Sequence, residues 1–331
     1  MKSAKTVVYA LLVLMVALLA ACGNSTSEPS PSGGAAGPDE AGTIRLGLVG
    51  GGMTPMIAQI GLSDGSYEQA GIRIEQNDFT AGADMIQALV GGSLDIALGS
   101  YEHVLRQQQN GLGVKAYGEI FNGVGYSLVV KKDAPYESLQ DLKGTTLAVT
   151  KVGSLSDTGL REGLAEAGID PEKDVQLING GSGATMLAAI ESGSAAGGMV
   201  SEPTISQMLA SGNYRILYDP PFDYAGIVIM AKTDWVAKNE ELMKLFLKTT
   251  AEINERSQQD ASGAVDAMAK TFNQIPRDVL ESAVANQLAK VPEGLEVTKD
   301  GADYVQKTQL DHGVLKQEIP FEETVDLSLL P

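Results

Sequence analysis

The feature that most constrains this chain is a 21-residue stretch that occurs twice, 101 residues apart. Residues 82–102 and 183–203 align without a gap, and seven of the 21 positions are identical. Each copy predicts a glycine-rich start, a short helix with one apolar face, and a short apolar strand that ends on a serine, Ser100 or Ser201. Two such units predict two similar α/β lobes. The alternative is two unrelated helix–strand units that share an Ala/Gly-rich composition.

The ends of the predicted strands carry binding chemistry. In α/β sheets, ligands bind beyond the carboxyl ends of the strands. The first predicted strand, residues 43–49, leads into a run of three glycines, and Thr54 is placed to cap a helix that has Pro55 at its first position. Such a turn offers free N–H groups to a polar or anionic ligand. A nucleotide phosphate loop is disfavoured, because Pro55 occupies the place of its third small residue.

A second helix start is predicted near residue 154. Ser154 and Asp157 have the spacing of a capping box, and Ser156 is a second candidate cap. Capping and ligand contact are both compatible with this pattern, since a capped helix start still exposes N–H groups. We therefore keep both roles for the two serines.

Composition and charge exclude several classes of function. Aromatic residues make up 5% of the chain, which argues against a platform for stacking sugars or single-stranded nucleic acid. The formal net charge is −18, and the first 21 residues contribute two lysines, so the rest of the chain carries −20. Nucleic acid is therefore not an expected partner, because proteins that bind nucleic acid carry basic patches.

The N-terminal residues predict export. Residues 1–21 begin with Lys2 and Lys5 and continue as an apolar segment too short for a comfortable membrane span. The segment ends in Leu19-Ala20-Ala21-Cys22, which resembles the lipobox of bacterial lipoproteins and implies cleavage before Cys22 and its lipidation. An ordinary secretory signal is the alternative. Residues 22–42 predict a flexible tether, and a single cysteine excludes an internal disulfide.

Catalysis is not expected from these residues. His103 and His312 are the only histidines, and no metal-ligand spacing or nucleophile-elbow motif is present. His103 follows Ser100 closely and so lies near the predicted cleft, although a surface position on a helix is the more common case for such a residue. We expect no catalytic residue, no metal and no cofactor.

Three motifs together resemble one family. They are Gly92-Ser93-Leu94-Asp95-Ile96-Ala97-Leu98, the run Leu139-Gln140-Asp141-Leu142-Lys143-Gly144 with the strand after it, and Ser201-Glu202-Pro203. Residues 43–331 resemble the nitrate/sulfonate/taurine-type substrate-binding proteins of ABC importers, which include thiamine-precursor binders. The resemblance implies a type II periplasmic-binding fold, with two α/β lobes joined by two crossings around a ligand cleft. Lobe 1 would comprise residues 43–124 and 225–331, and lobe 2 residues 125–224.

The resemblance also implies which residues face the ligand. They come from the loops at strand ends in both lobes, and are Gly51, Met53, Thr54, Thr80, Gly82, Ser100, Tyr101, Ser154, Ser156, Ser182, Ser201 and Glu202. One position departs from the family pattern, because Ala196 stands where an aspartate matching Asp95 is usual. We expect that aspartate to be structural, so the ligand prediction is little affected.

Two ligand classes remain open. A sulfonate, nitrate or taurine-type oxyanion would be held by neutral donors at helix starts, with Lys151 as the nearest cation and no arginine on these loops. An aminopyrimidine would need aromatic walls and an acid such as Glu202. We favour the oxyanion. The expected protein is a monomeric receptor, anchored outside the cell membrane by lipid, that passes its solute to an ABC permease.

Two other classes of function are weaker. An enzyme on the same two-lobed fold would need a cleft acid, base or nucleophile, and would turn its ligand over. An adhesion lipoprotein would hold no ligand in a closed cleft.

Overall fold

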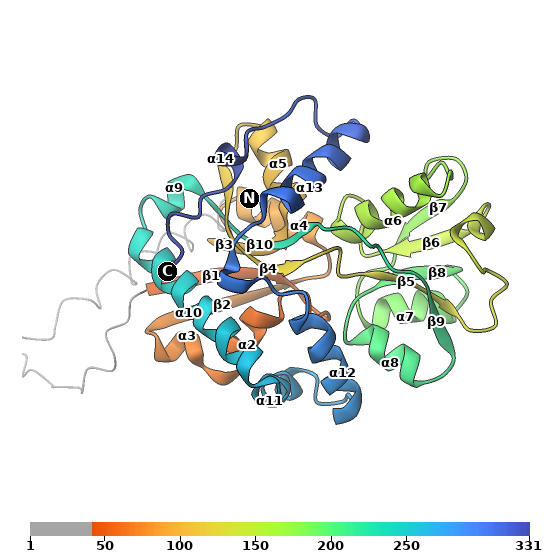
Figure 1. The fold of residues 1–331 in the computed structure, drawn as a ribbon, viewed down its shortest axis with the longest axis horizontal. Helices are drawn as coiled ribbons and strands as arrows, with labels where there is room; N and C mark the ends of the chain where they lie inside the picture. The colour runs from red at the N-terminus through yellow and green to blue at the C-terminus, as the bar shows by residue number, and fades with distance from the viewer. Residues whose placement is uncertain (1–41) are drawn as a thin grey trace, which may run out of the picture. The chain divides into compact units, whose positions relative to one another are not determined.

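The computed structural model describes residues 42–331, so the predicted signal peptide, Cys22 and the tether as far as residue 41 lie outside the described part of the chain. These described residues belong to one compact unit. Two five-stranded sheets organise it, each in its own lobe (Figure 1). No helix within residues 42–331 combines the length and the apolar character that crossing a bilayer requires.

The sheet of lobe 1 is mixed. Its strand order is β2 (Ile72–Phe79), β1 (Gly42–Val49), β3 (Ile96–Ser100), β10 (Ala225–Lys232) and β4 (Val114–Asn122). β1 runs parallel to β2 and β3, whereas β10 is antiparallel to both β3 and β4. Seven of the eight residues of β10 are buried, as expected for a strand covered on both faces.

The sheet of lobe 2 repeats this arrangement. Its order is β7 (Gln176–Asn179), β6 (Thr146–Val149), β8 (Gly197–Val200), β5 (Ser127–Lys131) and β9 (Tyr214–Tyr218). Residues 46–47 of β1 pair with 96–97 of β3, and residues 147–148 of β6 pair with 197–198 of β8. The pairing register itself is therefore repeated at an offset of 101 residues. The predicted pair of similar lobes is confirmed, and the alternative of two unrelated units is wrong.

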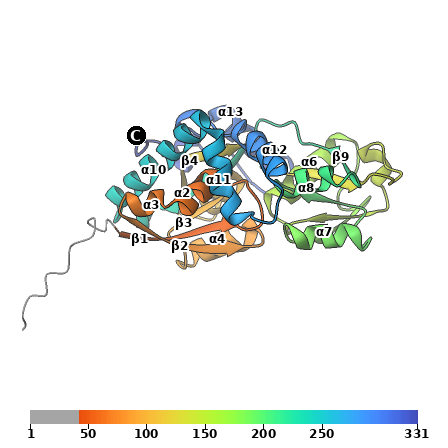
Figure 2. The same ribbon diagram turned by 90° about the horizontal axis from the view of Figure 1, so that it is seen from below.

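Helices cover both sheets (Figures 1 and 2). Lobe 2 carries α6 (Leu155–Glu166), α7 (Ala184–Glu191) and α8 (Thr204–Ala210). In the first part of lobe 1 lie α2 (Met56–Asp64), α3 (Ser66–Gln69), α4 (Gly82–Val90) and α5 (Tyr101–Gln109). Its C-terminal part adds α9 (Thr233–Val236), α10 (Glu240–Gln259), α11 (Ala261–Thr271), α12 (Arg277–Leu288), α13 (Lys299–Asp311) and α14 (Phe321–Thr324).

The long helix α10 closes the core of lobe 1. It buries one face, including Phe246 and Ile253, whereas its charged residues are exposed. The Phe246 ring stacks on Tyr67 of α3 with 5.1 Å between centroids, and the Tyr67 hydroxyl bonds to Thr250 one turn further on. Burying a side chain of this size stabilises the fold by about 1.5–3 kcal/mol.

Asp95 is structural, as predicted. Its carboxylate accepts hydrogen bonds from the backbone N–H and the guanidinium of Arg45, at 2.6–3.0 Å. These bonds fix the start of β3 against β1. At the matching place in lobe 2, the Ala196 N–H donates to the carbonyl of Thr146 at 2.8 Å. A backbone bond thus secures β8 without the aspartate.

Two crossings connect the lobes. The first lies between β4 and β5, and the second between β9 and β10. The Gly123 N–H of the first crossing donates to the Tyr224 carbonyl of the second at 2.7 Å, and the Asn122 side chain donates to Asp223 at 2.9 Å. The two crossings therefore lie side by side and form one hinge.

Candidate ligand-binding site

The glycine-rich first turn of lobe 1 touches the second repeat copy in lobe 2. The Ser182 hydroxyl donates to the Gly50 carbonyl at 2.9 Å, and the Met53 N–H donates to the Glu202 carbonyl at 2.7 Å. A Cβ atom on Gly52 would stand 2.7 Å from the Ser201 hydroxyl oxygen. A side chain at this position would thus press directly on lobe 2, which explains the glycine.

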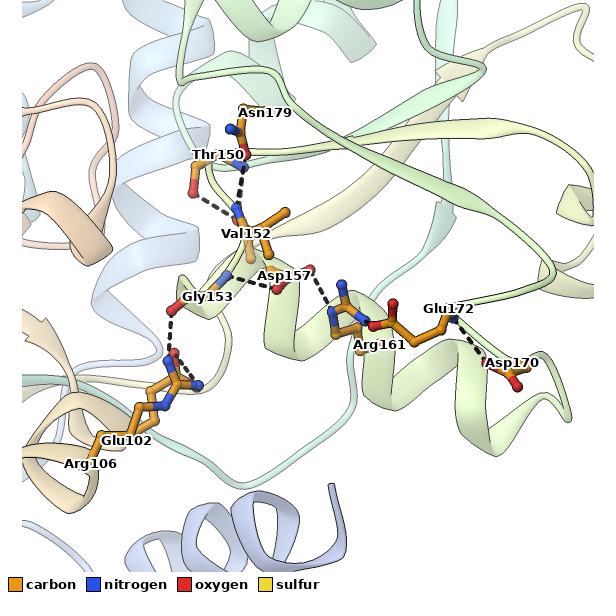
Figure 3. Close-up of polar contacts among 11 residues, drawn as sticks. Glu102, Arg106, Thr150, Val152, Gly153, Asp157, Arg161, Asp170, Glu172 and Asn179 are labelled. Carbon is orange, nitrogen blue, oxygen red and sulfur yellow. Dashed lines mark hydrogen bonds and ion pairs between the residues drawn. The ribbon is translucent and has the colours of Figure 1, made fainter. Parts of the chain in front are cut away.

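The start of the first repeat copy touches lobe 2 at a second place. The Ala83 N–H donates to the Ser154 hydroxyl at 3.1 Å, and Lys151 forms an ion pair with Asp84. The guanidinium of Arg106 donates to the Gly153 carbonyl at 2.8 Å (Figure 3). With contacts at both places, the lobes are closed on one another.

We call the region of these contacts between the lobes, from Gly50–Met53 to Ser154, the junction. Two buried polar atoms beside it have no hydrogen-bond partner. They are Nε2 of His103 and the Ser100 hydroxyl oxygen, from residues that are each 2% exposed. The Ser100 hydroxyl lies near that of Tyr224, which donates to Glu102 at 2.9 Å. A Cβ on Gly82 would lie 3.0 Å from His103 Nε2, so this nitrogen faces the start of α4. The common surface position for His103 is therefore wrong, because α5 turns this residue inward. An unpaired buried polar group costs about 1–3 kcal/mol, which a ligand could recover.

His103 is neutral at pH 7. Burial lowers the pKa of its imidazole to about 4, the neighbouring Glu102 opposes this shift, and Arg106 adds to it. A neutral imidazole can donate a hydrogen bond through Nε2 or accept one there. It therefore suits an oxyanion oxygen without requiring a counter-charge.

The stability of the protein should consequently depend on His103 below neutral pH. The unfolded chain binds a proton at this residue near pH 6.5 and the folded protein only near pH 4. The stabilisation is complete above pH 6.5 and is lost as the pH falls toward 4. We expect the free energy of unfolding to drop by about 2 kcal/mol more between pH 7 and pH 5 in the natural protein than in His103→Leu. Urea unfolding at both pH values measures this difference, and parallel pH profiles would contradict it.

Arg106 is a residue that sequence analysis missed. No arginine lies on the predicted loops, but α5 brings this one to the junction from its last turn. Its guanidinium lies 3.6 Å from the buried Glu102 carboxylate and also donates to Gln309 at 2.9 Å. The i,i+4 spacing of Glu102 and Arg106 behind Ser100 was the available signal. Lys151, the expected cation, is instead paired with Asp84.

The two serines near the start of α6 have different roles. Ser154 is the N-cap, but its hydroxyl caps no helical N–H and instead accepts from Ala83 across the junction. Asp157 accepts from the Gly153 N–H at 2.8 Å and pairs with Arg161 (Figure 3), so the predicted capping box is wrong. Ser156 lies inside the helix and accepts from the Thr150 N–H at 2.9 Å. Its hydroxyl is thus committed within lobe 2.

Glu202 is also committed to structure. It is 5% exposed, and its carboxylate accepts from the N–H and hydroxyl of Ser206 in the first turn of α8. Asn286 of α12 donates to the same carboxylate at 3.0 Å. These three bonds make Glu202 a cap for α8 and a tie to lobe 1, so we no longer assign it the role of an acid that reads a pyrimidine.

Some of the remaining predicted residues are used in packing within lobe 1, and others lie at the junction. Tyr101 is 2% exposed and its hydroxyl bonds to Thr324 of α14, which places it in the packing of lobe 1. Met53 is fully buried, Thr54 is 3% exposed, and Thr80 is exposed. The predicted Thr54 cap is wrong, because α2 begins at Met56 with Pro55 as its N-cap residue and no side-chain cap. Gly51 and Gly82 remain at the junction.

Five helices begin beside the junction: α2, α4, α5, α6 and α7. None of the five has a side-chain hydrogen bond at its N-cap. A helix N-terminus carries a partial positive charge and free N–H donors, so such a group favours negatively charged or oxygen-rich ligand atoms. Among residues 42–331 there is no group of three His, Cys, Asp or Glu side chains that could hold a metal ion.

Residues 55–256 match the family described as NMT1/THI5 like. This chain belongs to the NMT1/THI5-like family. A candidate binding protein of Brucella abortus (strain 2308) is 28% identical to this chain over 273 residues. The match covers 78% of this chain and 81% of that protein.

Solved structures show the same fold. The alkanesulfonate-binding protein SsuA of Xanthomonas axonopodis pv. citri, bound to MOPS, superposes with a TM-score of 0.74 at 18% identity, covering 88% of this chain and 99% of that one. The periplasmic nitrate-binding protein NrtA of Synechocystis PCC 6803 gives a TM-score of 0.69 at 15% identity, covering 87% and 86%. The predicted periplasmic-binding fold and the family resemblance are both confirmed for this NMT1/THI5-like protein.

Proposed function

We propose that this protein is a solute receptor of an ABC importer that binds a small oxyanion, of the sulfonate, nitrate or taurine type, between its lobes. The observation that carries the proposal is the unpaired, buried pair of Ser100 Oγ and His103 Nε2. Both atoms lie beside the junction, where five helices begin without a side-chain hydrogen bond from their own N-cap residue and where the Ala83 N–H of α4 donates to Ser154. The binding of sulfonate and nitrate by the structural neighbours supports the same ligand class.

The charges around the junction favour recognition by neutral donors. Lys151 is paired with Asp84, and Arg106 lies beside Glu102, so neither cation is left to balance an anion alone. An oxyanion would instead accept from backbone N–H groups, the Ser100 hydroxyl and the neutral imidazole of His103. Such donors cost no reorganisation when the lobes close. Gly52 and Gly82 allow the backbone to approach the ligand closely.

A second ligand class is supported by Glu102. Its carboxylate is fully buried, one oxygen accepts from the Tyr224 hydroxyl at 2.9 Å, and Oε1 has no hydrogen-bond partner. That oxygen lies 3.6 Å from the Arg106 guanidinium, so an exocyclic amino group would share it with this ion pair. The aminopyrimidine alternative therefore continues on Glu102 in place of Glu202.

The rest of the receptor proposal concerns its surroundings. Cleavage before Cys22 and lipidation of that residue would anchor a monomer outside the cell membrane, with residues 23–42 as a tether. Closure of the lobes would create the surface that docks on the permease. Other subunits of the importer would hydrolyse ATP. Mass-spectrometric detection of a diacylglyceryl group on Cys22 would test the anchor.

The experiment that tests the function is a thermal-unfolding screen of residues 38–331. The panel contains alkanesulfonates, taurine, nitrate and aminopyrimidines. A ligand present at one hundred times its dissociation constant adds about 2.7 kcal/mol to the free energy of unfolding, which is a clear shift of the midpoint. Stoichiometric binding without turnover supports a receptor, turnover supports an enzyme, and a folded protein that responds to nothing in the panel rejects the ligand class.

Ser154 and Ser156 provide a matched pair for the same assay. We expect Ser154→Ala to weaken ligand binding by roughly tenfold with little effect on the unfolding midpoint, because its hydroxyl bonds across the junction. Ser156→Ala should instead lower the free energy of unfolding by about 1–3 kcal/mol, because it leaves the buried Thr150 N–H without an acceptor. Equal effects of the two substitutions on affinity would contradict this assignment.

A further inference from the structure

A cavity lies at the hinge, with a volume of about 380 Å³. The two crossings, helix α8 of lobe 2 and the end of helix α12 of lobe 1 form its walls. Helices α8 and α12 contact one another and lie side by side in both views (Figures 1 and 2). Of the residues predicted for the cleft, only Glu202 lines this cavity. It is therefore separate from the proposed solute site.

The walls of this hinge cavity combine a cluster of apolar side chains with polar residues such as Asn122 and Lys290. Phe121 at the end of β4 and Val124 of the first crossing are buried beneath it, and Phe222 of the second crossing is half-buried. Leu209 of α8 is 40% exposed and Ile216 of β9 is 39% exposed. Only five large hydrophobic side chains are this exposed among residues 42–331, and two of them line this cavity. Apolar surface gathered around a concave site is typical of ligand-binding pockets.

One polar group in the wall lacks a partner. Gln287 of α12 is 4% exposed, and its Oε1 is buried without any hydrogen bond. The carboxylates of the cavity are already engaged, because Asp219 accepts from Ser127 at 2.7 Å and Glu202 accepts from Ser206 and Asn286. A small turn of the Gln287 amide would point its oxygen at a donor inside the cavity. The Gln287 amide oxygen is thus an acceptor that an N–H or O–H group of a ligand would satisfy.

We propose that the hinge cavity is a second binding site, for a small apolar molecule that carries one hydrogen-bond donor, such as a flat aromatic N–H compound. The volume lies at the lower end of the range of about 300–1,000 Å³ typical of small-molecule sites. The charged residues in the wall are Glu202, Asp219 and Lys290, which sum to −1 and so do not favour an anionic ligand. The proposal does not depend on the solute that the cleft binds.

Occupancy of the hinge cavity is coupled to lobe position. A molecule in it contacts α12 of lobe 1, α8 of lobe 2 and both crossings at once. The cavity is formed in the closed arrangement, in which Asn286 also reaches Glu202. A ligand that binds this arrangement favours closure, and by linkage it tightens binding in the cleft by the same factor.

Indole and 1-methylindole are the probes that test this site, because 1-methylindole carries a methyl group in place of the N–H hydrogen. We expect residues 38–331 to bind indole saturably, and roughly tenfold more tightly than 1-methylindole, in ligand-observed NMR titrations. Gln287→Leu should remove this preference while leaving weak binding of both probes. Leu209→Trp should block both probes, because it places a large ring at the rim of the cavity. Its matched control is Leu112→Trp, at a position that is 39% exposed and does not line the cavity.

Folding of each variant is checked by its thermal-unfolding midpoint, and Leu209→Trp keeps the test valid if Gln287→Leu unfolds. The proposal is overturned if neither probe binds, if the two bind equally to the natural protein, or if Leu209→Trp binds indole as well as Leu112→Trp does. A preference for indole that disappears with Gln287→Leu supports it.

Discussion

Gly226→Ala is expected to lower the free energy of unfolding by about 3 kcal/mol, because the new methyl group has no space at the hinge. A Cβ atom on Gly226 would stand 2.1 Å from the carbonyl oxygen of Gly123 and 2.7 Å from that of Phe121. Both are backbone atoms at the end of β4, so no side chain can rotate away. The Gly226 N–H also donates to the buried Glu119, which holds β10 in place. Urea unfolding of residues 38–331 measures the loss.

Gly91→Ala is the matched control for this prediction. Gly91 is exposed at the end of α4 and has ordinary right-handed helical backbone angles, φ −69° and ψ −8°. Alanine is preferred to glycine in this conformation, but its Cβ would lie 3.1 Å from the Gln87 carbonyl oxygen, so we expect a change in stability of less than about 1 kcal/mol. If Gly226→Ala were as stable as Gly91→Ala, the close approach of the two crossings would be wrong.

The second large effect concerns His103. We expect His103→Leu to weaken binding of the solute by tenfold or more, because it removes a donor beside Ser100 at the junction. The same substitution should leave stability at pH 7 unchanged or raise it, because it also removes a buried polar atom without a partner. Opposite effects on affinity and stability distinguish a ligand contact from a structural one. Calorimetric titration with the compound that gives the largest thermal shift measures the affinity.

His103→Gln refines this test. The amide of glutamine can place a donor near the position of Nε2, so part of the lost affinity should return. The assignment fails if His103→Leu lowers stability at pH 7 and leaves affinity intact, since that pattern describes a core histidine.

The fold could be predicted from the sequence because its information is local and repeated. The apolar spacing and the glycines of residues 82–102 and 183–203 specify one helix–strand unit twice. Two matching units predict two matching sheets, and β1 pairs with β3 in the same register as β6 pairs with β8. Asp95 could be read as structural for a similar reason, since it lies at the start of a strand and pairs with the strand beside it.

The candidate site depends on distant residues, so only part of it could be predicted. The sequence places Ser100, Ser154 and Gly82 at the ends of elements, and all three lie at or beside the junction. It does not say which hydroxyl is already used. Ser156 is engaged by Thr150, and Tyr101 by Thr324, 223 residues away in sequence.

Local sequence patterns were therefore enough to predict the two-lobed α/β architecture and the loops that meet between the lobes, because helix and strand periodicity depend on near neighbours. Which polar atoms those loops leave unpaired depends instead on contacts between residues far apart in the chain. Arg106 reaches Gly153 across 47 residues, and Glu202 is held by Asn286 across 84. Hydrogen bonds of that kind form only after the chain has folded, and they leave Ser100 and His103 without partners beside the junction.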